Sequence, residues 1–175
     1  MSDLLDDIFG KVTGDLDPFK KIASKIPGFK GYVERQARRD SDALLRKTIA
    51  SRFRELEKRI SYLQSSLESP SDAKYIDDLE VAVLRLRTFA DRVNTASRGY
   101  SPLFAAVKIN EEELARLYEY DAAMLDLTDE VGRAIDNVEA SIGTDGLPAA
   151  IRHLQTTSLK TIEVFERRDE VVLAQ

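Results

Sequence analysis

The stretch Ile49-Ala-Ser-Arg-Phe-Arg-Glu-Leu-Glu-Lys-Arg-Ile-Ser-Tyr-Leu-Gln-Ser-Ser-Leu67 decides the fold class, because its apolar residues recur at alternating spacings of four and three. Those residues are Ile49, Phe53, Leu56, Ile60, Leu63 and Leu67. This spacing places them along one side of an α-helix that packs lengthwise against other helices. No glycine lies between positions 32 and 98. We therefore predict one long helix over residues 32–67.

Capping and helix-breaking residues divide the rest of the chain into three further helical segments. Ser69-Pro70 has the serine and the first-turn proline that are typical of a helix start. Asn110 and Glu113 have the spacing of a capping box. Glycine and proline between positions 143 and 148 separate the last two segments. The four predicted helices cover residues 32–67, 71–97, 111–142 and 147–171.

These segments predict an all-α protein, because runs of alternating β-branched residues are missing from the sequence. The first and third turns are short, which favours antiparallel neighbours. Residues 98–109 form the longest predicted link. The expected architecture is an antiparallel four-helix bundle over residues 31–175, with a long first helix and an N-terminal amphipathic arm and basic hinge over residues 1–30.

The arm contains two short amphipathic pieces. In the first, Leu4, Leu5, Ile8 and Phe9 fit one helical face. The second starts at Asp17-Pro18 and carries Phe19, Ile22 and Ile26. Each piece is too short to be a stable helix alone in water, so each needs a surface on which to bury its apolar side.

Charge is distributed unevenly along the chain. The net charge is −5, but residues 19–39 contain seven basic residues and one acidic residue, a net of +6. Residues 1–18 and 69–175 are both predominantly acidic. A basic segment between acidic flanks can dock on a partner, bind an anionic surface, or pair with the acidic helices of its own bundle.

The segment Lys25-Ile-Pro-Gly-Phe-Lys-Gly-Tyr-Val-Glu-Arg-Gln-Ala-Arg-Arg39 joins the arm to the first long helix. Proline disfavours helical geometry in the residue before it, so Pro27 ends the arm, and Gly31 permits a tight turn. Phe29 and Tyr32 stand among lysines and arginines. They either cap the end of the bundle while the bases pair with acidic helices, or anchor in an anionic lipid interface. Nucleic acid is not an expected partner, because the chain is acidic overall and has no known nucleic-acid-binding motif.

Composition limits the location of the protein. The chain of 175 residues has no cysteine, which excludes disulfides and thiolate metal sites. No apolar run reaches the roughly 20 residues that span a bilayer. The acidic N-terminus lacks the cationic and apolar regions of a signal peptide. We expect a cytoplasmic protein, with a location at the membrane periphery as the alternative.

No residue pattern indicates catalysis. His153 is the sole histidine, and Ala150 stands where a di-iron Glu-x-x-His motif needs glutamate. Asp77-Asp78 lacks the third aspartate of an aspartate-rich magnesium site, because Val81 occupies that position. The acids at positions 111–113 fit the positive end of a helix dipole. We therefore predict no enzyme activity, metal, cofactor or small-molecule substrate.

Two polar residues interrupt the apolar seam of the third predicted helix, Asp121 and Thr128. If both face the core, Asp121 needs a cation, because an unpaired buried carboxylate is costly. The candidates on the second helix are Arg85, Arg87 and Arg92. Such a polar layer would fix the register of the bundle. Alternatively, a small rotation of the helix leaves both residues at its boundary.

Three segments carry a family resemblance: IPGFKGYVERQARRDSDALLR near the start, GYSPLFAAVKINEEELARLYEYD in the middle and FERRDEV near the end. Over most of residues 25–170 the chain resembles an uncharacterised bacterial family of small helical-bundle proteins. The resemblance implies a non-enzymatic bundle that works beside membrane scaffolds of the stomatin/prohibitin type. A weaker similarity is to phage-shock membrane-remodelling proteins, in which an amphipathic helix precedes a long coiled hairpin.

The sequence favours a non-catalytic adaptor or scaffold that engages a protein partner, or a second copy of itself. The contact is made through residues 1–30, that is, the N-terminal arm and its basic hinge (the basic joint). The alternative is a peripheral membrane protein whose arm inserts into anionic lipid, and a third reading is a carboxylate-metal enzyme. The candidate contact residues are Leu4, Leu5, Ile8, Phe9, Phe19, Lys20, Lys21, Lys25, Phe29 and Lys30.

Overall fold

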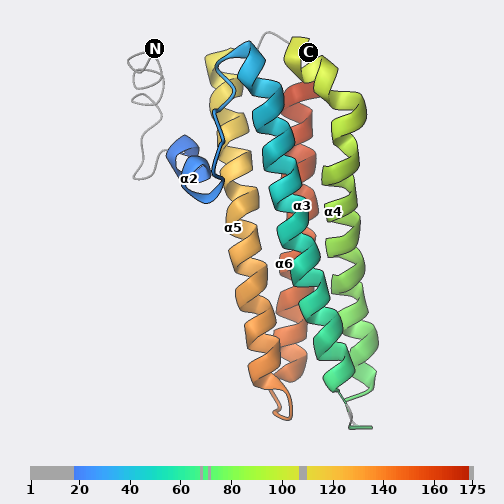
Figure 1. Cartoon of the computed structure of the whole chain (residues 1–175). Helices are drawn as coiled ribbons and strands as arrows, with labels where there is room; N and C mark the ends of the chain where they lie inside the picture. The colour runs from blue at the N-terminus through green and yellow to red at the C-terminus, as the bar shows by residue number, and fades with distance from the viewer. Residues whose placement is uncertain (1–17, 68, 71, 107–109, 174–175) are drawn as a thin grey trace.

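The computed structural model describes residues 18–67, 69–70, 72–106 and 110–173. Within these residues the chain forms five α-helices and no strand, so the all-α prediction is confirmed. The helices are α2 (Pro18–Lys25), α3 (Arg35–Ser66), α4 (Lys74–Ala106), α5 (Glu111–Ser141) and α6 (Leu147–Leu173) (Figure 1).

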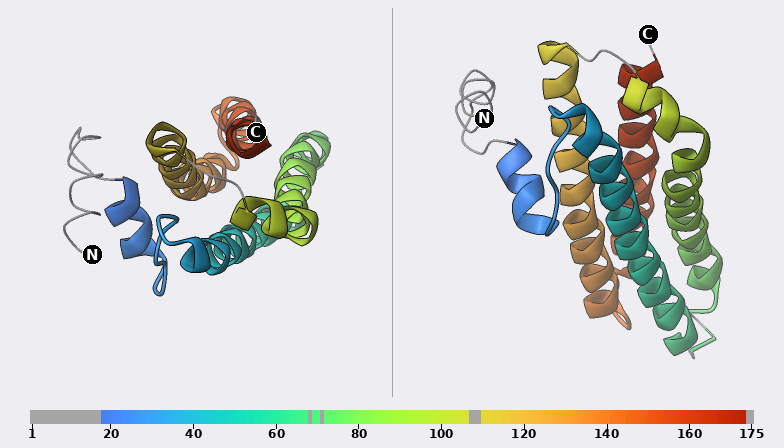
Figure 2. Two further views of the ribbon diagram at one scale, coloured as in Figure 1. Left: turned by 90° about the horizontal axis from the view of Figure 1, so that it is seen from above. Right: turned by 45° about the horizontal axis from the view of Figure 1, so that its top comes forward.

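The helices α3 to α6 lie side by side as a helical bundle (Figure 1). In this bundle α3 packs against both α4 and α5, and α6 packs against the same two helices. Seen from above, α4 and α5 occupy opposite corners, although they follow each other in the chain (Figure 2).

Several helix boundaries differ from those predicted, and α4 begins at Lys74 instead of residue 71. The helix α3 begins at Arg35, because Gly31 has a φ of +84° and Glu34 is extended. The helix α4 continues to Ala106, so the prediction that it ends at residue 97 is wrong. Of the link expected over residues 98–109, residues 98–106 belong to α4 and residues 107–109 lie outside the described residues. Gly99 and Pro102 weaken a helix without necessarily ending it. The last part of α4 turns away from the axis of the rest (Figure 1).

Apolar side chains at the predicted spacing fill the core. Five of the six residues of the α3 seam are buried, and Leu56 is half-buried. Three aromatic rings from different helices meet at the centre: the ring centroids of Phe53 and Phe89 lie 4.6 Å apart, and those of Phe89 and Phe165 lie 5.8 Å apart. Burying a phenylalanine side chain stabilises the fold by about 1.5–3 kcal/mol.

The capping box before α5 is confirmed. The side chain of Asn110 accepts a hydrogen bond from the backbone N–H of Glu113 at 2.9 Å, and Glu113 accepts one from the Asn110 N–H at 3.0 Å. These bonds satisfy two backbone donors that a helix N-terminus otherwise leaves unpaired. They fix the residue at which α5 starts.

The short helix α2 lies against α5 (Figure 1). Its Ile22 is fully buried, and Ile26, just after its last residue, is 1% exposed. The surface that this short piece requires is therefore the side of α5. The predicted division of the chain at residue 30 stays a prediction.

Candidate functional site

The connection between α2 and α3 depends on two glycines in the left-handed region, Gly28 with φ of +87° and Gly31 with φ of +84°. Residues with a β-carbon rarely adopt this conformation. At Gly31 a β-carbon would also lie 2.6 Å from the Tyr118 hydroxyl and 3.0 Å from the ring of Phe19. Glycine is thus required at position 31 both for its backbone conformation and for close packing.

Four aromatic rings gather around this hinge: Phe19 of α2, Phe29 and Tyr32 of the hinge, and Tyr118 of α5. The rings of Tyr32 and Tyr118 stack with centroids 5.2 Å apart, and Phe29 meets Tyr32 edge-on at 5.4 Å. Phe19 meets Tyr118 edge-on at 5.8 Å. Edge-to-face and offset-stacked pairs of this kind add stability beyond the area that they bury.

Tyr32 is the anchor of the hinge. Its backbone N–H donates to the Tyr118 hydroxyl at 2.8 Å, and its own hydroxyl donates to Oδ2 of Asp121 at 2.5 Å. Its carbonyl accepts a hydrogen bond from Nε of Arg38 at 2.9 Å. Because Tyr32 is fully buried, these bonds form away from solvent, where an unmade bond is most costly.

Asp121 connects this anchor to a buried ionic network that spans three helices. Nε of Arg168 in α6 donates to Oδ1 of Asp121 at 2.6 Å, and Nη2 of Arg168 donates to Oδ1 of Asp42 in α3 at 2.6 Å. Arg46 in turn donates from Nε to Oδ2 of Asp42 at 2.9 Å. All four side chains are at most 2% exposed.

A third carboxylate, that of Asp169, completes the network at longer range. Its Oδ1 lies 3.8 Å from Nη2 of Arg46 and 3.9 Å from Nη1 of Arg168. These distances are too long for hydrogen bonds but keep the unlike charges close. Two guanidinium groups thus hold three carboxylates together.

Burial governs the protonation equilibria of the network. Desolvation raises the pKa of Asp121 above its usual range, although Arg168 and the Tyr32 hydroxyl favour the carboxylate. The pKa of Asp169 is also raised by burial, against the attraction of Arg168 and Arg46. Burial, together with Asp121, raises the pKa of Tyr32 well above that of an exposed tyrosine.

The charged groups of this network pair with one another across α3, α5 and α6. The carboxylate oxygens of Asp121 and Asp42 accept hydrogen bonds from guanidinium and phenol groups. Among the residues that the structure describes, no group of three or more histidine, cysteine, aspartate and glutamate side chains could hold a metal ion. The arrangement pairs charges and fixes the positions of the helices that carry them.

The structure decides the placement of the polar residues in α5. Asp121 is fully buried and Thr128 is 6% exposed, so the alternative that both lie at the boundary is wrong. The cation that pairs with Asp121 is Arg168, and the predicted partners from α4 are wrong. Arg85 donates to the carbonyl of Gln155, Arg87 pairs with Glu57, and Arg92 pairs with Glu166.

The spacing of residues in α6 indicates that Arg168 is buried. The buried residues of α6 continue at spacings of four and three through Ser158, Thr161 and Phe165 to Arg168. Arg168 therefore occupies a core position of the repeat. Asp42 similarly precedes the buried Ile49 by seven residues.

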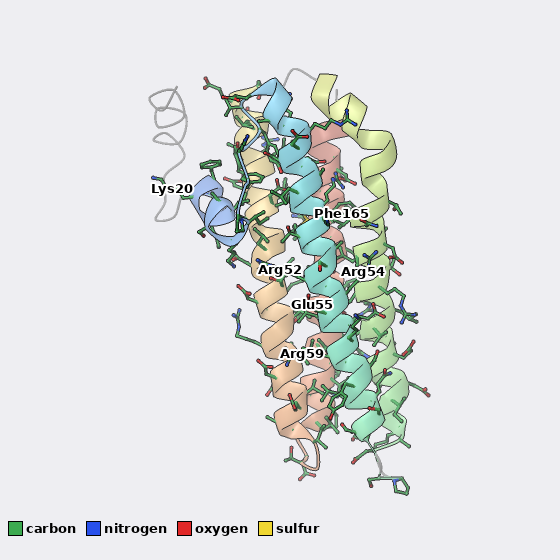
Figure 3. The ribbon with its side chains drawn as sticks, in the orientation of Figure 1. Lys20, Arg52, Arg54, Glu55, Arg59 and Phe165 are labelled. Carbon is green, nitrogen blue, oxygen red and sulfur yellow. The ribbon has the colours of Figure 1, made fainter. Side chains whose placement is uncertain are left out.

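The candidate contact residues fall into four groups. Leu4, Leu5, Ile8 and Phe9 lie outside the described residues. Phe29 is buried and Phe19 is half-buried against the bundle, so Phe29 is a packing residue and not an exposed anchor. Lys20 and Lys30 are exposed, and Figure 3 shows Lys20 on the outer side of α2.

The remaining two lysines pair with acidic residues of α5. Lys21 forms an ion pair with Asp126. Nζ of Lys25 donates to Oδ2 of Asp129 at 2.8 Å, which lowers the pKa of that carboxyl group. The backbone carbonyl of Lys25 also accepts a hydrogen bond from Arg52 of α3 at 2.9 Å. The bases of the joint thus partly pair with the bundle itself.

A groove of about 630 Å³ runs between α5 and α6, next to these ion pairs. Its wall combines Tyr120 and Val164 with acidic and basic side chains of both helices.

None of the described helices has the length and apolar character needed to cross a membrane. Comparisons with family models, curated proteins and solved structures give no match to this chain.

Proposed function

We propose that the chain is a non-catalytic adaptor or scaffold, built as an antiparallel four-helix bundle with a long first helix, that engages a protein partner through its N-terminal arm and basic joint. The observation that carries this proposal is the mutual pairing of the buried charges. Side chains that could do chemistry in the interior are bound to one another across α3, α5 and α6. Such a core suits a rigid support for surface contacts.

Contacts between helices support the proposed arrangement. Arg54 pairs with Asp91, whereas Gln64, farther along α3, donates to Glu80, which lies earlier in α4; this order fits opposite directions. In α5 and α6 the pair of Asp121 with Arg168 and that of Glu130 with Lys160 have the same reversed order.

The exposed lysines of the joint support its role as the contact surface. Lys20 and Lys30 are exposed beside the hinge, whereas Lys21 and Lys25 pair with acidic residues of α5. An acidic partner surface would meet these two side chains first. The same features favour the alternative of an anionic membrane surface. The resemblance to bundle proteins beside membrane scaffolds is compatible with either partner.

The test is a comparison of proteins that co-purify with the intact chain and with two variants. One variant lacks residues 1–17, and the other carries Lys20→Glu and Lys30→Glu. We expect a protein that is recovered with the intact chain and lost from both variants, while Lys58→Glu, an exposed reversal on α3, retains it. Equal recovery with all four baits would contradict the proposal. Sedimentation velocity of the same proteins tests self-association.

A further inference from the structure

We propose that residues 18–30 form a displaceable latch, and that an anionic lipid surface competes with α5 for the same face of this latch. The proposal rests on the membrane alternative of the proposed function and adds its regulation: the contact that the structure shows is the closed state. Apolar burial and ion pairs hold this state, together with hydrogen bonds from Arg52 to the Lys25 carbonyl and from the Lys30 N–H to Oγ of Ser41. A lipid surface offers the first two kinds of contact.

The apolar side of the latch is buried in the bundle. Ile22, Ile26 and Phe29 are at most 7% exposed, and Phe19 packs against Tyr118. With only eight residues, α2 cannot remain helical alone in water. Its helix therefore exists where a surface covers its apolar side. In the closed state that surface is α5, and the interfacial region of a bilayer is another.

The cationic side of the latch is held by contacts that phosphate groups can replace. Lys21 and Lys25 pair with Asp126 and Asp129, whose side chains are 50% and 55% exposed. Ion pairs this exposed to water contribute little and are screened by salt. Anionic headgroups attract the same lysines. Lys20, already exposed on α2, adds a third cation without any rearrangement.

The hinge lets the latch open without unfolding the bundle. Tyr32 stays fixed by Tyr118 and by Asp121. Immediately before this anchor lie Gly31 and Gly28, both with positive φ. Rotation about these glycines moves the residues before them and leaves the buried ionic network intact. The break between the moving and fixed parts therefore falls at Gly31.

Gly31→Ala disturbs the packing of the latch without changing a lipid-facing group. The added β-carbon would collide with the Tyr118 hydroxyl at 2.6 Å and the Phe19 ring at 3.0 Å. Because the Tyr118 hydroxyl also accepts the Tyr32 N–H, urea unfolding of this variant checks that the bundle itself stays folded. The matched control is Gly143→Ala, which has a similar positive φ of +77° but meets no atom within 4 Å. Both replacements strain the backbone, but only the first disturbs the latch.

The first experiment measures amide hydrogen exchange of residues 18–30 and co-sedimentation with vesicles. The vesicles contain either phosphatidylcholine alone or an equal mixture with phosphatidylglycerol. For Gly31→Ala we expect at least tenfold faster exchange in the latch and at least fivefold more protein bound to the anionic vesicles, in a salt-sensitive manner. Gly143→Ala should match the native chain. Faster exchange without increased binding to anionic vesicles, or equal binding to both vesicle types, overturns the proposal.

A second experiment closes the latch covalently. Because the chain has no cysteine, Lys21→Cys with Asp126→Cys introduces the only two thiols, which a short bismaleimide can join. The same protein before cross-linking is the control. We expect cross-linking to abolish the binding of anionic vesicles, and undiminished binding after cross-linking overturns the latch. If Gly31→Ala instead strengthens binding of a co-purified protein and not of vesicles, the lipid assignment fails while the adaptor function stands.

Discussion

Arg168 of α6 and Asp121 of α5 form a hydrogen-bonded ion pair of 2.6 Å in which neither side chain is exposed to solvent. The same guanidinium group reaches Asp42 of α3, so one residue joins three helices. Buried ion pairs are weak evidence for stability, because desolvation of both charges opposes their attraction. Their geometry nevertheless ties one position of α6 to one position each of α5 and α3. We infer that this pair specifies how the helices align.

Arg168→Met is expected to destabilise the protein strongly. It would leave the carboxylates of Asp121 and Asp42 buried without their shared cation, and breaking a buried pair in this way costs about 3–5 kcal/mol. Urea unfolding followed by circular dichroism measures the loss. The matched control is Arg167→Met, an exposed neighbour that should change the free energy of unfolding by less than about 0.5 kcal/mol. Similar values for the two variants would contradict the assigned role of Arg168.

Tyr118→Phe removes the hydroxyl that accepts the backbone N–H of Tyr32. A buried donor left without its acceptor costs about 1–3 kcal/mol, so we expect a loss of that size in the free energy of unfolding. Tyr120→Phe is the control, because Tyr120 is half-buried on the groove side of α5. If the two variants have the same stability, the hinge does not depend on the Tyr118 hydroxyl.

The sequence predicts the helices better than it predicts their ends and polar contacts. Apolar spacing identifies α3, α5 and α6, because the same residues that repeat along the chain are buried. The end of α4 is missed because Gly99 and Pro102 lower helix stability locally, while distant packing decides whether the helix continues.

The sequence predicts the buried carboxylate of the ionic network but not the cation that pairs with it. The polar residue Asp121 at a seam position indicates a buried carboxylate that needs a cation. The identity of the cation depends on which helices are neighbours and on their register, neither of which follows from helix spacing alone. Arginine is seldom fully buried unless it is paired, so Arg168 resembles a surface residue until its partner is known. Only its place in the repeat of α6 distinguishes it from Arg167.

The difference in the free energy of unfolding between Asp169→Asn and the native chain is expected to rise with pH. Burial raises the pKa of Asp169 in the folded protein, so the folded state binds a proton more tightly than the unfolded state. Stability contributed by the neutral acid is therefore lost as pH rises from about 4 through the raised pKa. The asparagine variant should gain stability relative to the native chain over this range. Denaturant titrations between pH 3 and pH 7 measure this difference, and a difference that falls with pH would contradict the argument.

Asp129→Asn should show the opposite dependence. The hydrogen bond from Lys25 lowers the pKa of Asp129 in the folded state, so its contribution is present above about pH 4 and is lost as pH falls through the lowered pKa. Because the pair is largely exposed to solvent, the loss at pH 7 should be at most about 1 kcal/mol. The difference between the variant and the native chain should therefore shrink as pH falls below about 4. Denaturant titrations measure the loss, and amide hydrogen exchange of α2 should be faster in Asp129→Asn but unchanged in the control Glu130→Gln, whose side chain pairs with Lys160 of α6.

Gly132→Ala is expected to stabilise the protein. Gly132 lies inside α5, where glycine is less favourable than alanine by about 0.5–1 kcal/mol. The nearest atom to an added β-carbon is Cδ2 of Leu56 at 3.8 Å, an ordinary van der Waals contact, so the methyl group fits without displacement. Gly143→Ala provides the contrast, because its φ of +77° makes the same replacement strained. Thermal unfolding should place the midpoint of Gly132→Ala above that of the native chain and the midpoint of Gly143→Ala below it. A lowered midpoint for Gly132→Ala would mean that α3 and α5 pack more closely at Leu56 than the structure indicates.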